Sequence, residues 1–424
     1  MLYNVVMKKH LTIKEVSELL DISKETLRRW DAAGKLVPKR HPINKYRIYD
    51  KAELEYVMQL ELPSIDQQDT DSPSPFDEII TPIREYKSIE LFAGAGGLAI
   101  GLEHAGLNTV LLNEIDKYAC ETLRKNRPQW NVVEASIAAL NFEQYRGQVD
   151  VVTGGFPCQA FSFAGKKLGF DDARGTLFYE FARAVKEIQP LIAIGENVRG
   201  LLSHENGKTL NGMVSVLEEL GYDVLLPRVL KATKYMVPQK RERLILVAIR
   251  KGTNITFEYP KPCAYEPTLR DALKEGVLYD CDVPYSSGQL YPKSKEEVLQ
   301  LVPPGGYWRD LPIDIQKQYM QKSYYLGGGK TGMARRISWD EPSLTLTCAP
   351  AQKQTERCHP DHTRPFTVRE YARIQTFPDD WVFAGSMTQQ YKQIGNAVPV
   401  NLAYAIGKQI VKALNGYYEN YGKK

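Results

Sequence analysis

A glycine-rich turn between an apolar segment and a helical segment constrains the fold of this chain most. The apolar run 88–92 has the length of a buried strand, and the glycine-rich run 93–98 follows it directly. Glycines let the backbone pass close to a ligand, and the free amides at the start of a following helix bind polar ligand groups. We therefore predict that a strand, a tight turn and a helix begin an α/β sheet here.

The next predicted strand completes a βαβ unit. Residues 108–113 form this strand, which ends at Glu114, and Asp116 follows two residues later. An acidic side chain at this position can accept hydrogen bonds from the diol of a ribose. The unit therefore predicts a nucleoside-containing cofactor. These residues alone leave open which cofactor it is, because dinucleotide enzymes share the pattern.

A second junction between strand and loop presents a thiol. The apolar run 149–152 is followed by Gly154, Gly155 and Pro157, which break the strand, and Cys158 comes next. Ligands bind at the carboxyl edge of open α/β sheets, so Cys158 is a candidate nucleophile. The alternative is a buried small hydrophobic residue, which is a common fate of free cysteine.

Two more segments bring polar groups to this edge. The predicted strand 191–194 ends before Glu196, which places a carboxylate at the edge that holds Cys158. Another strand is predicted at 244–249, and alternation puts the polar residues that precede it on one face. These residues are Gln239, Arg241 and Arg243. A solvated strand edge is the alternative for the arginines.

Composition narrows the class of protein. Hydrophobic residues make up 43% and charged residues 25%, as in soluble globular proteins. No run approaches the roughly 18 apolar residues of a membrane helix, and we see no signal-peptide pattern, so we expect a cytoplasmic protein without membrane contact. The six cysteines lack paired spacing, which predicts neither a disulfide framework nor a metal site.

The N-terminal segment carries the excess positive charge. Residues 1–60 hold 12 Lys and Arg against 8 Asp and Glu, which accounts for the net charge of +4 of the chain. Thr12 and Glu15 predict a capping box that opens a helix, and a second helix is predicted from Lys24 to a stop at Gly34. Two helices joined by a tight turn form a helix-turn-helix. Its second helix would present to DNA Lys24, Thr26, Arg28 and Arg29.

A β-wing is predicted after these helices, over residues 38–49, where basic and apolar side chains alternate. The segment 12–50 resembles the winged helix-turn-helix of the MerR and excisionase families. The resemblance implies DNA binding, and we expect the protein's own promoter as a target. A small helical domain that only packs or dimerises is the alternative. Residues 61–86 contain a Ser-Pro-Ser-Pro run and few apolar residues, so they predict a linker.

Periodicity fades over residues 254–335, where prolines, glycines and aromatic residues dominate. Basic side chains accumulate at the end of this stretch, and together with aromatic rings and flexible backbone they suit nucleic-acid contact. They are Lys317, Lys322, Lys330, Arg335 and Arg336. A plain solvated loop is the alternative. Regular structure returns with a helix capped by Thr367 and a last amphipathic helix at 401–414.

Six motifs, taken in order, resemble the cytosine-carbon-5 DNA methyltransferase family from about residue 87 to 414, outside the stretch 254–335. They begin at Phe92, Gly155, Glu196, Gln239, Arg369 and Gly395. The family usually has an aspartate after its third strand, where this chain has Ser136-Ile137. The resemblance implies a Rossmann-like α/β methyltransferase fold with a smaller, irregular target recognition domain, here preceded by the winged helix.

The resemblance also implies the cofactor, the site and the domain limits. The cofactor is S-adenosylmethionine. Its expected contacts are Phe92, Ala93, Gly94, Gly96, Gly97, Leu98, Glu114, Ile115, Ser136, Ile137, Pro157, Leu177, Asn396 and Val398. Further expected DNA contacts are Ser162, Arg174 and Gln239. The expected domains are 1–60 (winged helix), 61–86 (linker), 87–253 (catalytic), 254–364 (target recognition) and 365–424 (C-terminal helices).

The implied reaction is methyl transfer to carbon 5 of a cytosine flipped out of double-stranded DNA, by a monomer on its site. Cys158 would add to carbon 6, Glu196 would neutralise charge at ring nitrogen 3, Arg241 would hold the carbonyl oxygen and Arg243 would position Cys158 or a phosphate. Two alternatives stay open: a tRNA or RNA cytosine methyltransferase, and a DNA-binding regulator without catalysis. A bacterial restriction–modification setting is expected.

Overall fold

The structure is a computed structural model of the 424-residue chain. It describes residues 10–13, 15–16, 31, 38–40, 46–50, 76–157, 176–326 and 330–421. Several predicted site residues lie outside the described residues, so the structure places none of their side chains. They are Cys158, Ser162 and Arg174, and the helix-turn-helix residues Lys24, Thr26, Arg28 and Arg29.

An eight-stranded sheet forms the centre of the molecule. Its strands are β4 (Tyr86–Leu91), β5 (Leu107–Glu114), β6 (Val132–Glu134), β7 (Val151–Gly154), β8 (Ile192–Val198), β9 (Tyr222–Val224), β10 (Arg228–Lys231) and β12 (Glu242–Arg250). The strands β6, β5, β4, β7 and β8 lie side by side and run parallel. β12 is antiparallel to β8 and pairs with β9 and β10 on its other edge. The predicted α/β fold is confirmed.

The strand order reverses between β4 and β7. From β4 the chain moves outward to β5 and β6, and then returns to place β7 on the other side of β4. The connections that leave two such neighbouring strands diverge, which opens a crevice at their carboxyl ends. The glycine-rich turn after β4 and the loop after β7 both begin at this crevice.

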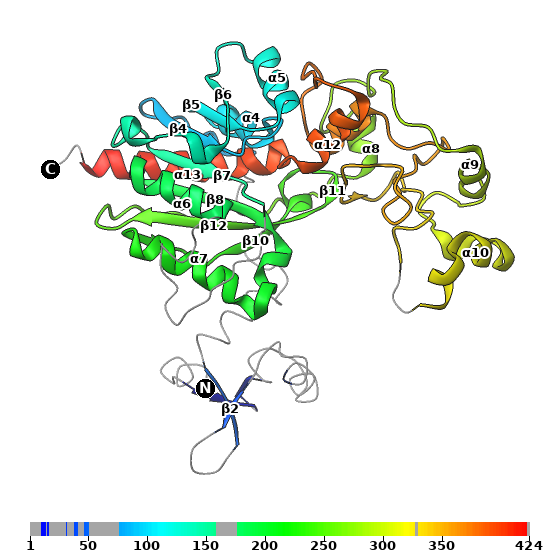
Figure 1. The fold of residues 1–424 in the computed structure, drawn as a ribbon, viewed down its shortest axis with the longest axis horizontal. Helices are drawn as coiled ribbons and strands as arrows, with labels where there is room; N and C mark the ends of the chain where they lie inside the picture. Colours follow the sequence, from blue (N-terminus) through cyan, green and yellow to red (C-terminus); the bar gives the residue numbers. More distant parts are fainter. Residues whose placement is uncertain are drawn as a thin grey trace.

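Helices cover both faces of the sheet (Figure 1). α6 (Leu177–Ile188) and α7 (Lys208–Glu219) pack on one face, and α4 (Gly97–His104) and α13 (Val400–Tyr421) pack on the other. The pleat of β12 explains this division, since alternate side chains of a strand point to opposite faces. Leu244 and Leu246 join the α6 and α7 side, whereas Ile245 and Val247 join the α13 side.

The remaining elements of the large domain connect these layers. They are α5 (Lys117–Asn126), α11 (Val368–Ile374), α12 (Met387–Asn396) and the 3-10 turns η2 (Ile137–Ala139), η3 (Glu143–Tyr145), η5 (Arg199–Leu202), η6 (His204–Gly207) and η7 (Ala232–Tyr235). The sequence prediction made the strand 191–194 too short. β8 continues to Val198 because β12 pairs with it along its whole length, so Glu196 lies within the strand.

The stretch without clear periodicity forms a smaller domain with a separate hydrophobic cluster, which lies to one side of the sheet (Figure 1). Its elements are α9 (Lys293–Leu299), η8 (Trp308–Asp310), α10 (Ile313–Met320) and η9 (Gln321–Tyr325). Two further elements contact the large domain: α8 (Leu269–Leu273) shares a hydrophobic cluster with α11, and β13 (Ser343–Leu344) pairs with β11 (Gln239–Lys240). Regular ladders are short here, so side chains must satisfy much of the buried backbone.

In the smaller domain, the side chain of Arg336 donates hydrogen bonds to buried backbone carbonyls. It is 4% exposed, and its guanidinium donates to five oxygens, which are the carbonyls of Leu299, Val302, His359 and Pro360 and the hydroxyl of Thr363. The expectation that Arg336 contacts nucleic acid is therefore wrong, because its donors hold loops of its own domain together.

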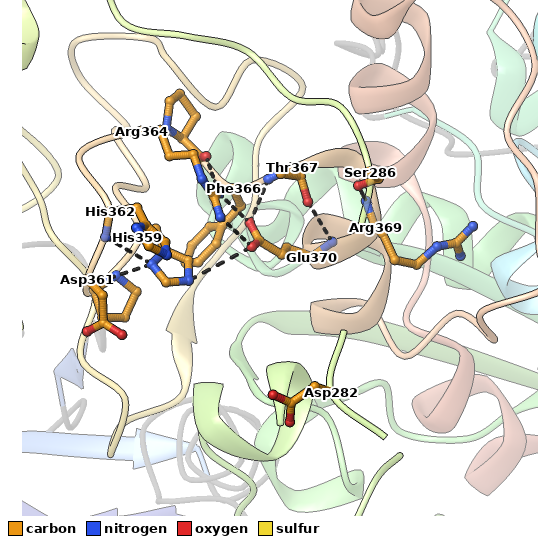
Figure 2. Close-up of polar contacts among 12 residues, drawn as sticks. Asp282, Ser286, His359, Asp361, His362, Arg364, Phe366, Thr367, Arg369 and Glu370 are labelled. Atoms are coloured by element: carbon orange, nitrogen blue, oxygen red, sulfur yellow. Dashed lines mark hydrogen bonds and ion pairs between the residues drawn. The ribbon is translucent and has the colours of Figure 1, made fainter. Parts of the chain in front are cut away.

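The start of α11 is fixed by a second buried charge. Figure 2 shows Glu370 between Arg364, Thr367 and His359. Its carboxylate accepts two hydrogen bonds from Arg364, at 2.7 and 2.8 Å, and one from the amide of Thr367 at 2.7 Å. Thr367 caps the helix as predicted, and its hydroxyl accepts from the amide of Glu370. This cluster joins the end of the smaller domain to the large one.

The described N-terminal residues form a three-stranded antiparallel sheet in the order β1 (His10–Thr12), β3 (Arg47–Asp50), β2 (Lys39–Arg40). The predicted capping box is present, since the amide of Thr12 donates to Glu15 at 2.7 Å and the amide of Glu15 donates back to the Thr12 hydroxyl at 3.3 Å. Strands β2 and β3 lie where the wing was predicted. Within the described part of the chain, no helix is long and apolar enough to cross a membrane.

Candidate active site

A cavity of about 830 Å³ opens at the carboxyl ends of β4, β5, β7 and β8. Most of the predicted cofactor residues line its wall, and three of the four predicted catalytic residues do so as well. These residues are Phe92, Ala93, Gly94, Gly97, Leu98, Glu114, Ile115, Pro157, Leu177, Asn396 and Val398, with Glu196, Arg241 and Arg243. The cavity therefore combines segments that are as far apart in the chain as Phe92 and Val398.

The glycine turn after β4 is shaped by Glu114. One carboxylate oxygen of Glu114 accepts from the amide of Gly94 at 2.8 Å, and the other accepts from the amides of Ile115 and Asp116, each at 2.8 Å. A Cβ on Gly97 would lie 2.2 Å from the carbonyl oxygen of Val398, so this position requires glycine. The turn, the end of β5 and the segment before α13 are thus held in close contact.

Three predicted cofactor residues do not line the cavity. Gly96 has a φ of 88°, and a Cβ there would meet Leu123 at 2.8 Å, so its role is to allow the turn to pack on α5. Ser136 is exposed at the start of η2, and Ile137 is 4% exposed within the hydrophobic cluster beneath α6. Packing accounts for Gly96 and Ile137, so we correct these two assignments, whereas the cofactor contact of Ser136 stays a prediction.

Sequence reasoning missed Glu90, which lines the cavity from within β4. Glu90 is 2% exposed, and its Oε2 atom has no hydrogen-bond partner. Burial raises the pKa of this carboxyl well above its usual value, and the charge of Glu114 raises it further. An acidic residue inside an otherwise apolar strand was the signal that could have identified it.

Glu196 and Arg243 form an ion pair at the cavity wall, with 2.5 Å between Oε1 and Nε. Burial raises the pKa of Glu196, although the charges of Arg243 and Arg241 oppose this shift. A Cβ on Gly155 would lie 3.0 Å from the Glu196 carboxylate. The loop that leads to Cys158 therefore passes directly beside this acid.

Asn197 fixes the same loop from the neighbouring strand. Its side-chain amide donates to the carbonyl oxygen of Phe156 at 2.8 Å, and Asn197 is 5% exposed. Strand β8 thus positions both the acid of the site and the loop that precedes Cys158. The role of Asn197 was not predicted, although it stands beside Glu196 in the same motif.

Arg241 lies behind the ion pair and is 2% exposed. It donates to the carbonyl oxygens of Gly395 at 3.1 Å and Ala397 at 3.0 Å. Burial lowers the pKa of Arg241, and the neighbouring charge of Arg243 lowers it further. Its Nη2 atom is thus directed at the backbone before α13, whereas its Nε atom is buried without a hydrogen-bond partner and the residue lines the cavity.

Gln239 is a supporting residue. It is fully buried, its amide nitrogen donates to Gln375 at 3.0 Å, and its amide oxygen accepts from the amide of Leu346 at 2.9 Å. The prediction that Gln239 contacts DNA is therefore wrong, because its polar atoms are occupied inside the protein. The segment it holds, residues 345–348, lines the cavity and was not predicted to do so.

No group of histidine, cysteine, aspartate and glutamate side chains suited to a metal ion occurs among the residues that the structure describes. The wall of the cavity instead offers backbone amides, ion pairs and a buried carboxyl. Such groups suit an organic ligand with hydroxyl and charged groups.

Comparison with known proteins assigns the family. Residues 86–412 match the family described as C-5 cytosine-specific DNA methylase, and residues 12–49 match the MerR family regulatory proteins. The chain is 61% identical over 412 residues to the Type II methyltransferase M.Eco47II of Escherichia coli, covering 97% of each chain. It is 57% identical to M.PspPI of Psychrobacter sp., covering 96% of this chain and 97% of that one.

Solved structures show the same fold at lower identity. A DNA modification methyltransferase encoded within an Escherichia coli prophage superposes with a TM-score of 0.55 at 24% identity, over 78% of this chain and all of that one. The DNMT2 protein of Spodoptera frugiperda gives a TM-score of 0.55 at 19% identity, over 79% of this chain and all of that one. The family match and the curated relatives favour neither an RNA methyltransferase nor a regulator without catalysis. The chain belongs to the C-5 cytosine-specific DNA methylase family, whose members methylate carbon 5 of cytosine in DNA.

Proposed function

We propose that this protein methylates one cytosine within a specific site of double-stranded DNA, using S-adenosylmethionine and a covalent Cys158 adduct, as the modification enzyme of a Type II restriction–modification system. The observation that carries the proposal is the buried pair Glu196–Arg243 beside the loop that leads to Cys158. The Type II relatives of this length support the restriction–modification setting.

The residues that line the cavity support S-adenosylmethionine as the methyl donor. Glu114 can accept from the ribose hydroxyls, Ile115 offers an exposed apolar side chain to the adenine ring, and Asn396 and Val398 line the same cavity. The unpartnered carboxyl of Glu90 suits a ligand that carries positive charge, because a buried carboxylate gains most from an ionic partner. When bound, S-adenosylmethionine supplies an electrophilic methyl group on a sulfonium sulfur.

The side chains of the site activate the cytosine ring for methylation. The Cys158 thiolate forms a bond to carbon 6 of cytosine, which raises the electron density at carbon 5. Glu196 shares or donates a proton at ring nitrogen 3 and so neutralises the developing charge; proton transfer of this kind accelerates reactions by roughly 10²–10⁴-fold. After methylation a base removes the proton of carbon 5, and the Cys158 thiolate leaves as the bond to carbon 6 breaks.

The geometry favours exchanging the roles that the family resemblance implied for Arg241 and Arg243. Arg241 was expected to hold the carbonyl oxygen of the base, but its Nη2 atom donates to the carbonyls of Gly395 and Ala397. Arg243 lies against Glu196 at the cavity wall. We therefore assign the contact with the carbonyl oxygen to Arg243, whereas Arg241 holds the backbone before α13 in place.

The smaller domain and the N-terminal segment supply DNA binding in this proposal. In this proposal the chain is divided into the five segments predicted from the sequence, which are 1–60, 61–86, 87–253, 254–364 and 365–424. Residues 76–85 already belong to the large domain by contact, since Asn415 of α13 accepts from the amide of Ile83 and donates to the carbonyl of Thr81. The match of residues 12–49 to MerR family regulatory proteins supports DNA binding by this segment, and its target in this proposal is the protein's own promoter.

Two linked experiments test the proposal. Bisulfite sequencing of DNA from cells that express the protein identifies the modified cytosine and its flanking sequence. A duplex with 5-fluorocytosine at that position is then incubated with the protein and S-adenosylmethionine, and the adduct is mapped by mass spectrometry. We expect a covalent complex at residue 158 that Cys158→Ser abolishes while promoter binding survives. An adduct elsewhere, or methylation of tRNA in preference to duplex DNA, would overturn the proposal.

A further inference from the structure

An ion pair lies at the wall of the cavity, away from Glu196. Lys392 of α12 and Asp116, which follows β5, both line the cavity, and Nζ of Lys392 is 2.8 Å from Oδ2 of Asp116. The side chain of Lys392 is 50% exposed and that of Asp116 is 26% exposed. The pair joins two segments that are 276 positions apart in the chain.

The two carboxylate oxygens of Asp116 have separate partners. Oδ1 accepts from the amides of Tyr118 at 3.0 Å and Ala119 at 3.3 Å and so caps α5, whereas Oδ2 accepts from Lys392. The amide of Asp116 also donates to Glu114 at 2.8 Å. Asp116 therefore connects the Glu114 turn, the start of α5 and the cavity side of α12.

Hydrogen bonds between uncharged groups also join α5 to α12 and to the segment before α12, and they do not involve Lys392. Thr122 of α5 donates to Gln393 at 2.6 Å, and Asn126 and Val382 exchange two hydrogen bonds of 2.8 Å each. Figure 1 shows α5 and α12 close together at the top of the molecule. Loss of the ion pair would consequently leave the helices in place and free the turn at the cavity.

That turn carries Ile115, which lies between Glu114 and Asp116 in sequence. Ile115 lines the cavity with 69% of its surface exposed, and its amide donates to Glu114 at 2.8 Å. An exposed apolar residue held only by its backbone can adopt several orientations unless its neighbours are fixed. Glu114 fixes the backbone before Ile115, and the Asp116–Lys392 pair fixes the backbone after it.

We propose that Lys392 is a positioning residue for the methyl donor: its ion pair with Asp116 holds Ile115 and the Glu114 carboxylate in the orientation that donor binding needs. The inference rests on the proposed function, which places S-adenosylmethionine in this cavity. Burial would raise the pKa of Asp116, but the hydrogen bonds from Lys392 and the α5 amides lower it overall, so the carboxylate is charged at neutral pH. The pair is therefore ionic under working conditions.

The variants separate the ion pair from the helix cap. Asp116→Asn keeps a side-chain oxygen that caps α5, since asparagine is as good an N-cap as aspartate, and removes only the charge. Lys392→Gln removes the other charge, and Lys392→Arg restores it. Lys240→Gln is the matched control, because Lys240 pairs with Glu341 at 3.1 Å with similar exposure and does not line the cavity.

The readouts are the Kd of S-adenosylhomocysteine by calorimetry, and KM and kcat for S-adenosylmethionine with a DNA substrate. We expect Lys392→Gln and Asp116→Asn each to raise the donor Kd and KM about two- to fivefold, as an exposed ion pair allows, with kcat unchanged. The double variant should be no weaker than either single one, Lys392→Arg should restore binding, and Lys240→Gln should have no effect.

Two results would overturn the inference: an unchanged donor Kd in Lys392→Gln, or a double variant whose loss equals the product of the single losses. A purely structural role is excluded if the thermal midpoint of the empty protein stays the same while the Kd changes. If the unaltered protein binds neither S-adenosylhomocysteine nor S-adenosylmethionine, the proposed function fails instead, and the two failures are thereby distinguished.

Discussion

Glu196 and Arg243 meet across two neighbouring strands, with 2.5 Å between a carboxylate oxygen and the guanidinium Nε. The strands β8 and β12 are antiparallel, and their pairing sets Arg243 opposite Val198, two residues beyond Glu196. The sheet itself, rather than a loop, therefore fixes the relative position of the acid and the cation. Groups held on strands keep the accurate geometry that catalysis needs.

Glu196→Gln should reduce kcat for DNA methylation by about 10²–10⁴-fold, because the amide cannot supply a proton at the ring nitrogen. Donor affinity should change little. Single-turnover methylation of a duplex, together with the calorimetric Kd of S-adenosylhomocysteine, measures the two quantities. Glu242→Gln is the control, since Glu242 adjoins Arg243 in sequence but pairs with the exposed Arg199. Equal rates in both variants would contradict the assigned role.

Glu90→Gln should flatten the pH dependence of stability in the empty protein. The pKa of Glu90 is raised by burial above its unfolded value, so the folded state binds the extra proton. The free energy of unfolding then falls as pH rises from about 4.3 through the folded pKa. Thermal midpoints between pH 5 and 8 should fall less steeply in the variant, whereas the exposed Glu143→Gln should follow the unaltered protein. Parallel curves for all three proteins would argue against a buried, protonated Glu90.

Gly97→Ala should lower donor affinity more than tenfold, because the added Cβ lies 2.2 Å from the carbonyl oxygen of Val398 and one cavity wall must move. The matched control is Gly416→Ala in α13, where a Cβ meets nothing within 4 Å. That change should leave the donor Kd unaltered and should stabilise the helix by roughly 0.5–1 kcal/mol. Calorimetric Kd values and thermal midpoints provide the comparison.

Arg336→Met should loosen the smaller domain while the donor cavity stays intact. The substitution leaves buried carbonyl oxygens without a donor, and each such oxygen costs roughly 1–3 kcal/mol. We expect faster proteolysis within residues 254–364 and weaker DNA binding, with an unchanged Kd for S-adenosylhomocysteine. Lys322→Met, on the exposed turn η9, is the control for loss of a positive charge. Protease resistance equal to that of the control would show that Arg336 does not hold these loops.

The sequence predicted the sheet and most of the cavity wall because these depend on local patterns. Apolar runs identified β4, β5, β7 and β12, and the glycine turn located the cavity. The parts that it missed depend on tertiary contacts. Nothing in the spacing of Gln239 and Arg241 indicates that their polar groups are used inside the protein, since strand alternation specifies a face but not what covers it.

The sequence did not predict that residues 345–348 line the cavity, because this too depends on tertiary contacts. This segment follows an irregular stretch, and its place beside the cavity arises from β13 pairing with β11 and from Leu346 bonding to Gln239. Likewise, the departure Ser136-Ile137 was interpreted through the family pattern, whereas packing takes Ile137 into the hydrophobic cluster.

The position of residues 345–348 limits how specificity can be exchanged between relatives. Thr345, Leu346, Thr347 and Cys348 lie at the end of the smaller domain in sequence, yet they form part of the donor cavity. A hybrid enzyme joined at residue 364 would receive a foreign cavity wall along with its new recognition loops. A hybrid joined before Ser343 would keep the native wall, the β11–β13 pairing and the contact between Gly395 and Thr347. The junction of such a hybrid should therefore lie before β13 in the sequence.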